Sequence, residues 1–125
     1  MLDQFKGAGF DVFPGSEVFL LDGLRAGGKG CITATGNVNP GPIANVYKNW
    51  RSTEADKLQA GITATRKIVQ KQPMIPALKA TVAHFGNDPQ WKTCRPPLVE
   101  LTGAQEEELI RDLNAAGFTM PGLAG

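Results

Sequence analysis

Apolar and polar residues alternate over residues 10–14, and the alternation stops at Pro14. A period of two that ends at a proline is typical of a short strand followed by a turn. Ser16 and Glu17 come next and supply a hydroxyl cap and an acidic first turn, which favour the start of a helix. Apolar residues then recur three apart, and we expect this helix to end at Gly27.

A second segment of strand character covers residues 30–35, which are mostly apolar and rich in β-branched side chains. We expect the next helix to begin near Pro42, because a proline ring is tolerated in the first turn of a helix. The order is therefore strand, helix, strand, helix, with connections of a few residues. This order predicts an α/β fold with a parallel sheet that is covered by helices.

The rest of the chain is predicted to be mainly helical. Apolar residues spaced for one helical face indicate a helix over about 53–72, which Pro73 ends, and a shorter helix over about 77–85. Thr102 and Gln105 have the spacing of a capping box, so we expect the last helix to begin there.

Two parallel strands are too few to form a stable sheet. Each would leave a row of unpaired backbone groups on an open edge. Parallel sheets are stable when helices cover both faces and several strands share the core. The pattern therefore indicates a portion of a larger fold whose remaining strands are not in this chain.

The net charge is close to zero, with 13 Lys and Arg against 12 Asp and Glu. This balance provides no field for gathering phosphate backbones or anionic lipid, so we expect no nucleic-acid partner and no membrane partner. The longest apolar run, residues 18–21, is far shorter than the ~20 residues of a membrane span. No basic start followed by an apolar stretch indicates a signal peptide.

Few residues in the sequence suit metal binding or disulfide formation. Cys31 and Cys94 are the two cysteines, and His84 is the single histidine. Two cysteines make neither a disulfide framework nor a metal ligand set. We therefore expect reduced thiols in a cytoplasmic protein, without a metal site.

A glycine-rich segment at residues 23–30 nearly matches the phosphate loop GxxxxGK[ST]. Gly30 stands where a Ser or Thr must bind magnesium, and the segment leads from a helix into a strand, which is the reverse of the required order. The sequence thus gives little support to a nucleotide-binding domain.

A better candidate site lies where the two predicted strands end. Residues 14–17 join a strand to a helix N-terminus, where free backbone N–H groups are available, and Gly15 would permit a ligand to approach the backbone. Thr33 and Thr35 end the second strand, where α/β folds place ligands. A plain strand-to-helix turn with a good cap is the alternative interpretation of residues 14–17.

None of the eight lysines is a convincing catalytic residue. A lysine that forms a Schiff base needs a pocket of low dielectric constant, usually at the catalytic end of a strand. Lys29 precedes the second predicted strand, and the other lysines fall in helices or loops. We therefore expect no catalytic nucleophile in this chain.

Five segments occur in an order and spacing that cover nearly the whole chain: 13–17 (FPGSE), 26–33 (AGGKGCIT), 37–38 (NV), 74–79 (MIPALK) and 95–98 (RPPL). Together they resemble the C-terminal part of the dihydrodipicolinate synthase / N-acetylneuraminate lyase family. These are the pyruvate-type class I aldolases, which are built on a TIM barrel. The resemblance implies that residues 10–14 and 30–35 are the seventh and eighth barrel strands. A complete barrel needs about 250 residues.

Members of this family join pyruvate or another 2-oxo acid to an aldehyde, or cleave the product, through an imine on a lysine of the sixth strand. The resemblance places that lysine upstream of this chain. Gly15 matches the family's glycine that lines the substrate pocket, and Ile32 matches the hydrophobic residue whose backbone lies beside the pyruvyl group. Ser16 and Glu17 occupy turn positions that in some members contact the distal part of the substrate.

Two departures from the family pattern leave the substrate open. Ser16 and Glu17 differ from the acidic pair in the Gly-Asp-Asp of the synthases, and Ala34 stands where the neuraminate lyases carry a serine. An aldolase or dehydratase for a 2-oxo acid derived from a sugar acid is therefore equally compatible with the sequence.

The resemblance implies a partial barrel, with the last two βα units at 1–51 and a C-terminal helical region of the same domain at 52–125. We expect the C-terminal portion of a lyase that is inactive alone and needs no cofactor. Its expected partners are a small 2-oxo acid and, if the barrel is complete, further copies of the protein. A non-catalytic helical interaction module is the alternative, although the apolar segment 30–35 lacks the edge-blocking charges that such a module needs.

Overall fold

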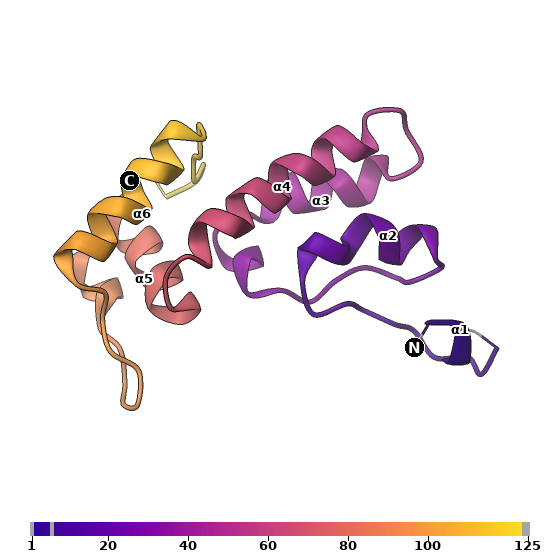
Figure 1. The fold of residues 1–125 in the computed structure, drawn as a ribbon, viewed down its shortest axis with the longest axis horizontal. Coiled ribbons are helices and arrows are strands. Elements are labelled where there is room, and N and C mark those ends of the chain that lie inside the picture. The colour runs from indigo at the N-terminus through magenta and orange to yellow at the C-terminus, as the bar shows by residue number, and fades with distance from the viewer. Residues whose placement is uncertain (1, 6, 124–125) are drawn as a thin grey trace. The chain divides into compact units, whose positions relative to one another are not determined.

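The structure is a computed structural model, and it describes residues 2–5 and 7–123 (Figure 1). The regular elements of these residues are helices. They are α1 (Leu2–Phe5), η1 (Glu17–Phe19), α2 (Leu20–Arg25), η2 (Ala34–Asn37), α3 (Pro40–Asn49), α4 (Ala55–Val69), α5 (Met74–Phe85), η3 (Pro89–Lys92) and α6 (Gly103–Ala115), where η denotes a 3₁₀-helix.

The two predicted strands are the main difference between expectation and structure. Residues 10–14 and 30–35 form no strand in the described part of the chain, so the strand predictions are wrong and the α/β class is not confirmed. Two backbone hydrogen bonds link residues 10–14 in parallel to residues 29–32, from Lys29 N–H to the Val12 carbonyl oxygen and from Ile32 N–H to the Pro14 carbonyl oxygen, both at 3.0 Å. No strand flanks either segment among residues 2–5 and 7–123, and these bonds do not extend into a regular ladder.

The predicted helices are confirmed, with shifted ends. Ser16 is the N-cap of η1 and accepts a hydrogen bond from Val18 N–H at 3.4 Å. Helix α3 begins at Pro40 and α5 begins at Met74, each a few residues earlier than predicted. Prolines fit these first turns because the backbone N–H groups there have no partner within the helix.

The chain divides into two compact units, Met1–Thr63 and Ala64–Gly125, which we describe separately. In the first unit, Leu20, Leu21 and Leu24 of α2 pack with Val46 of α3 and with Ile62 of α4. All five side chains are at most 5% exposed. Burying such a side chain contributes about 1.5–3 kcal/mol, so this cluster is the main stabilising element of the unit.

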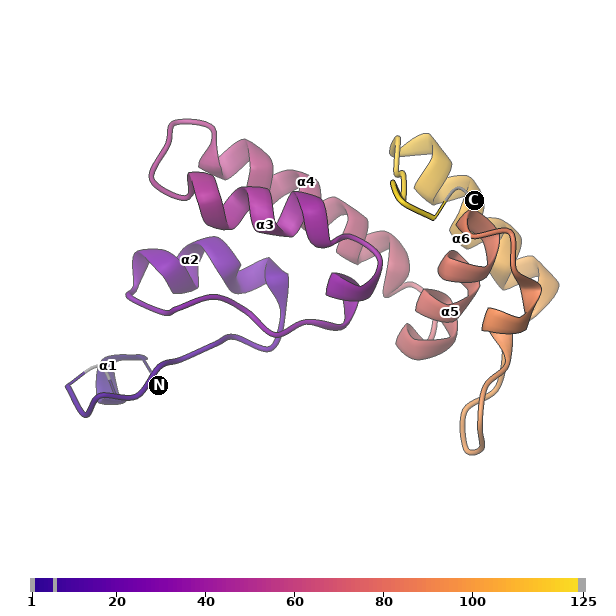
Figure 2. The same cartoon turned by 180° about the vertical axis from the view of Figure 1, so that it is seen from behind.

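In the second unit, Leu109 and Leu113 on the inner face of α6 are buried, and helices α5 and α6 lie side by side (Figures 1 and 2). The predicted capping box is confirmed: Thr102 accepts from Gln105 N–H at 3.3 Å, while Gln105 Oε1 accepts from Thr102 N–H at 2.9 Å. Gly117 has φ of 69° after the end of α6, which is a conformation that glycine adopts without strain.

Candidate functional site

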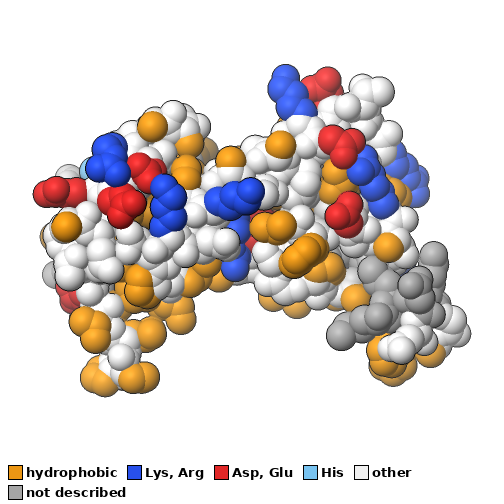
Figure 3. Space-filling model, in the orientation of Figure 1, with side chains coloured by type: hydrophobic (Ala, Val, Ile, Leu, Met, Phe, Trp, Pro, Cys, Tyr) orange, Lys and Arg blue, Asp and Glu red, His pale blue; other side chains and the backbone are white. Residues whose placement is uncertain are grey.

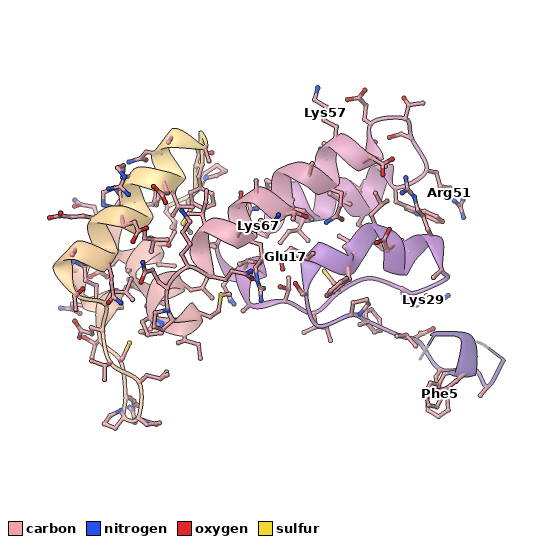
Figure 4. The ribbon with its side chains drawn as sticks, viewed as in Figure 1. Phe5, Glu17, Lys29, Arg51, Lys57 and Lys67 are labelled. Carbon is pink, nitrogen blue, oxygen red and sulfur yellow. The ribbon has the colours of Figure 1, made fainter. Side chains whose placement is uncertain are left out.

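A polar cluster forms where residues 14–17 meet residues 32–35. The side chain of Glu17 is 1% exposed and belongs to the interior of the first unit. Its two carboxylate oxygens accept hydrogen bonds from the hydroxyl groups of Thr33 and Thr35. Figure 4 shows Glu17 within the fold, whereas Lys29 and Lys57 extend outward.

Backbone contacts bring the predicted site residues together. The hydrogen bond from Ile32 N–H to the Pro14 carbonyl oxygen places Ile32 beside the turn that contains Gly15. A Cβ atom at Gly15 would meet no heavy atom within 4 Å, so this part of the turn is open. Gly15, Ser16, Glu17 and Ile32 therefore belong to one region of the molecule.

The two faces of segment 32–35 have opposite character. Ile32 is 74% exposed, whereas Thr35 is 0% exposed and Thr33 is half-buried. Successive side chains of an extended segment point to opposite faces, so Ile32 and Thr33 lie on different sides. The polar residues are thus turned inward to Glu17, and an apolar residue is turned outward.

Gln59 of α4 holds the turn from the other side, and the sequence analysis missed it. Its Nε2 donates to the carbonyl oxygens of Glu17 at 2.9 Å and Val18 at 3.2 Å, and also to Thr63 Oγ1 at 3.0 Å. Its Oε1 accepts from Leu21 N–H at 3.1 Å. A sequence signal was present, because Gln59 and Thr63 lie four apart beside the buried stripe of α4. The backbone groups that Gln59 bonds, however, are 38 to 42 residues away in the sequence.

A cavity of about 300 Å³ lies next to Thr33. Its lining includes Cys31, Gly36, Ile43 and Tyr47, with contributions from α3. Burial raises the pKa of the Cys31 thiol, and the negative charge of Glu17 raises it further. This thiol therefore stays protonated at neutral pH and is not an activated nucleophile.

The lysine closest in sequence to the site is Lys29, which lies on the surface. Its Nζ is 4.0 Å from a carboxylate oxygen of Asp11, and its side chain is 60% exposed. An exposed ammonium group beside a carboxylate lacks the desolvation that a Schiff-base lysine requires.

The described residues contain no group of three or more His, Cys, Asp or Glu side chains that could hold a metal ion. Among the helices of residues 2–5 and 7–123, none is long and apolar enough to cross a membrane.

Comparison with known proteins gives a consistent family. The dihydrodipicolinate synthetase family matches residues 3–116. The probable 2-dehydro-3-deoxy-D-pentonate aldolase YjhH of Escherichia coli is 30% identical over 116 residues, which are 87% of this chain and 37% of that protein.

Solved structures agree with this assignment. YagE, a prophage protein of the dihydrodipicolinic acid synthase family from Escherichia coli in complex with pyruvate, has a TM-score of 0.82 and 25% identity. The match covers 94% of this chain and 41% of YagE. A variant of the Sulfolobus solfataricus 2-keto-3-deoxygluconate aldolase has a TM-score of 0.79 at 19% identity, over 93% of this chain and 41% of that chain.

The chain thus spans about two fifths of the length of these relatives. The family match extends over most of the sequence, including both segments of the candidate site. The chain belongs to the dihydrodipicolinate synthetase family.

Proposed function

We propose that this chain is the C-terminal portion of a Schiff-base-forming aldolase-type lyase that acts on pyruvate or another 2-oxo acid. In this proposal residues 1–51 contribute the last two βα units of a TIM barrel, and residues 52–125 form its C-terminal helical region. Gly15 and Ile32 line the pocket for the pyruvyl part of the substrate, with Ser16 and Glu17 in the adjacent turn.

The observation that carries the proposal is the open face beside the Ile32–Pro14 hydrogen bond. The family match and the aldolases among the relatives support the proposal, as does the share of those relatives that the chain spans, which is 37–41%. The exposure of Ile32 fits a side chain that the rest of a barrel would cover.

The imine-forming lysine belongs, in this proposal, to polypeptide that precedes the matched portion. The exposed position of Lys29 supports this, as does the absence of a lysine from residues 30–47, the segment that runs from the cluster into α3. The chain alone would then contribute the pocket wall and an oligomer surface of a cytoplasmic enzyme without turning over substrate.

Borohydride trapping with pyruvate tests the proposal. The 125-residue chain should give no lysine adduct by mass spectrometry, whereas a longer polypeptide that includes the preceding barrel half should give one outside these residues. The variant Lys29→Arg is the matched control. An adduct on the parent chain that disappears in this variant would contradict the proposed position of the imine lysine.

A second candidate function, a non-catalytic helical interaction module, is favoured by the helical character of the regular elements in the described residues. A cooperative thermal transition of a dilute, monomeric sample would support the module. Aggregation, or a loose state that binds hydrophobic dyes, would support the portion of a barrel.

A further inference from the structure

The carboxylate of Glu17 does not face the open side of the candidate site. It is 1% exposed and accepts hydrogen bonds from Thr33 and Thr35, which lie on the inner side of their segment. Ile32 lies on the outer side and is 74% exposed. A ligand beside Ile32 would therefore meet the backbone of this segment, and Glu17 would lie behind that backbone.

The orientation of the Gln59 amide is fixed by its partners. Two carbonyl oxygens, of Glu17 and Val18, lie on its Nε2 side, and the N–H of Leu21 lies on its Oε1 side. A reversed amide would place oxygen against oxygen and N–H against N–H, so this orientation alone satisfies these groups. The side chain thus bonds three backbone positions to α4, two in η1 and one in α2.

We propose that Glu17 and Gln59 are positioning residues that set the separation between the turn at 14–17 and the segment at 32–35. Glu17 ties the turn to the two threonines, and Gln59 ties the same turn to α4. The inference rests on the proposed function, in which Gly15 and Ile32 line the pocket. Helix α4 then controls the geometry of the pocket without contributing a group that contacts the substrate.

A simpler role for Gln59 would be to stabilise only the start of α2. The two roles differ in what happens at Ile32, whose N–H is bonded to Pro14 and has no direct contact with Gln59 among the hydrogen bonds of the described chain. Only a residue that positions the turn would change the protection of that N–H.

Amide hydrogen exchange of the full chain, followed by NMR, separates these roles. The variant Gln59→Met keeps the length of the side chain and removes its hydrogen bonds. We expect exchange to become at least about tenfold faster at Leu21, whose buried N–H loses its partner, and at Ile32, whose acceptor Pro14 lies in the turn that Gln59 no longer holds. The matched control, Gln70→Met, replaces an exposed glutamine just beyond α4 and should leave both amides unchanged. Faster exchange at Leu21 alone would overturn the inference.

The role of Glu17 has its own chemical readout at Cys31. In a chain with Cys94→Ser, the rate of Cys31 alkylation against pH reports the pKa of that thiol. Glu17→Gln removes the charge that adds to the effect of burial, so the pKa should fall towards its ordinary value. An unchanged Cys31 profile in a folded Glu17→Gln chain would overturn the placement of the Glu17 side chain near Cys31.

Thr33→Val provides a second test in case Glu17→Gln fails to fold. It removes one hydrogen-bond donor to Glu17 and keeps the shape of a half-buried side chain. Exchange should accelerate at Ile32 and stay constant at Leu21, which Gln59 still holds. Unchanged exchange at Ile32 would contradict the role of Glu17.

These measurements use no substrate, so their failure differs from failure of the proposed function. An unaffected Ile32 amide would overturn the positioning roles and leave the lyase proposal standing. Missing imine formation in a completed barrel would overturn the lyase proposal, and the measured coupling between α4 and residues 32–35 would remain.

Discussion

Helices α5 and α6 and the paired segments 10–14 and 30–35 illustrate two ways of satisfying backbone groups. The helices form their hydrogen bonds within themselves, and the capping box at Thr102 completes one of them. The paired segments depend on each other: one bond joins them directly, from Ile32 N–H to the Pro14 carbonyl oxygen, and a second comes from the preceding Lys29. A helical pair can therefore form from local sequence, whereas extended segments need neighbours on both sides.

The distribution of apolar side chains follows the same division. Leu109 and Leu113 of α6 are at most 1% exposed, whereas Phe13 and Ile32 of the extended segments are 46% and 74% exposed. Figure 3 shows that hydrophobic side chains contribute visibly to the surface of the molecule. The extended region thus leaves apolar side chains exposed to solvent, whereas those on the inner face of α6 are buried.

Matched truncations should give the largest contrast between the regions. Leu113→Ala leaves a cavity in the second unit and should lower the free energy of unfolding by about 2–5 kcal/mol. Ile32→Ala removes an exposed side chain and should change it by less than about 0.5 kcal/mol. Urea denaturation followed by circular dichroism measures both. Equal losses would contradict the contrast.

Removing the cap of α6 should have a smaller effect. Thr102→Ala removes the hydrogen bond from Gln105 N–H to the Thr102 hydroxyl group and should lower the free energy of unfolding by about 1 kcal/mol. Thr93→Ala, at an exposed threonine that caps no α-helix, is the control. If the two variants unfold at the same urea concentration, the local cap does not contribute as the structure indicates.

The smallest expected effect is a pH dependence within the second unit. Lys71 donates a hydrogen bond to Asp112 at 2.8 Å, which lowers the pKa of this carboxyl group below its ordinary 3.8. The folded state therefore binds the proton less tightly than the unfolded state. The stabilisation is present above pH 3.8 and is lost as the pH falls through the lowered pKa.

Asp112→Asn should flatten this acid dependence in thermal melts recorded between neutral and acidic pH. Asp22→Asn, at an exposed carboxyl group of α2, is the matched control, and its melting temperature should fall with acidic pH as that of the parent does. If the melting temperature of the Asp112→Asn chain falls with acidic pH as steeply as that of the parent, the assignment of this lowered pKa to the ion pair is contradicted.

The sequence was informative where the signals are local. Ser16 and Thr102 each cap a helix as predicted, because a hydroxyl group and the N–H groups it bonds are at most three residues apart. Whether residues 10–14 and 30–35 form strands could not be predicted from these two segments alone. Alternation reports a preference for extended backbone, but a ladder depends on what pairs with it.

The arrangement of the candidate site residues was predictable in part, for the same reason. The local pattern indicated the turn at 14–17 and the family resemblance added Ile32, and a backbone hydrogen bond brings the two together; their role in binding stays a prediction. The inward direction of Glu17 and the role of Gln59 depend on contacts 16 to 42 residues apart, which no local pattern encodes.

The open segment at 10–14 also links the behaviour of the chain to its concentration. Its Val12 and Pro14 carbonyl oxygens are paired with residues 29 and 32, and no regular strand flanks its other edge in the described residues, next to Phe10 at 65% exposure. An exposed edge of this kind is a place where another extended polypeptide can pair, so we expect self-association to increase with the concentration of the chain.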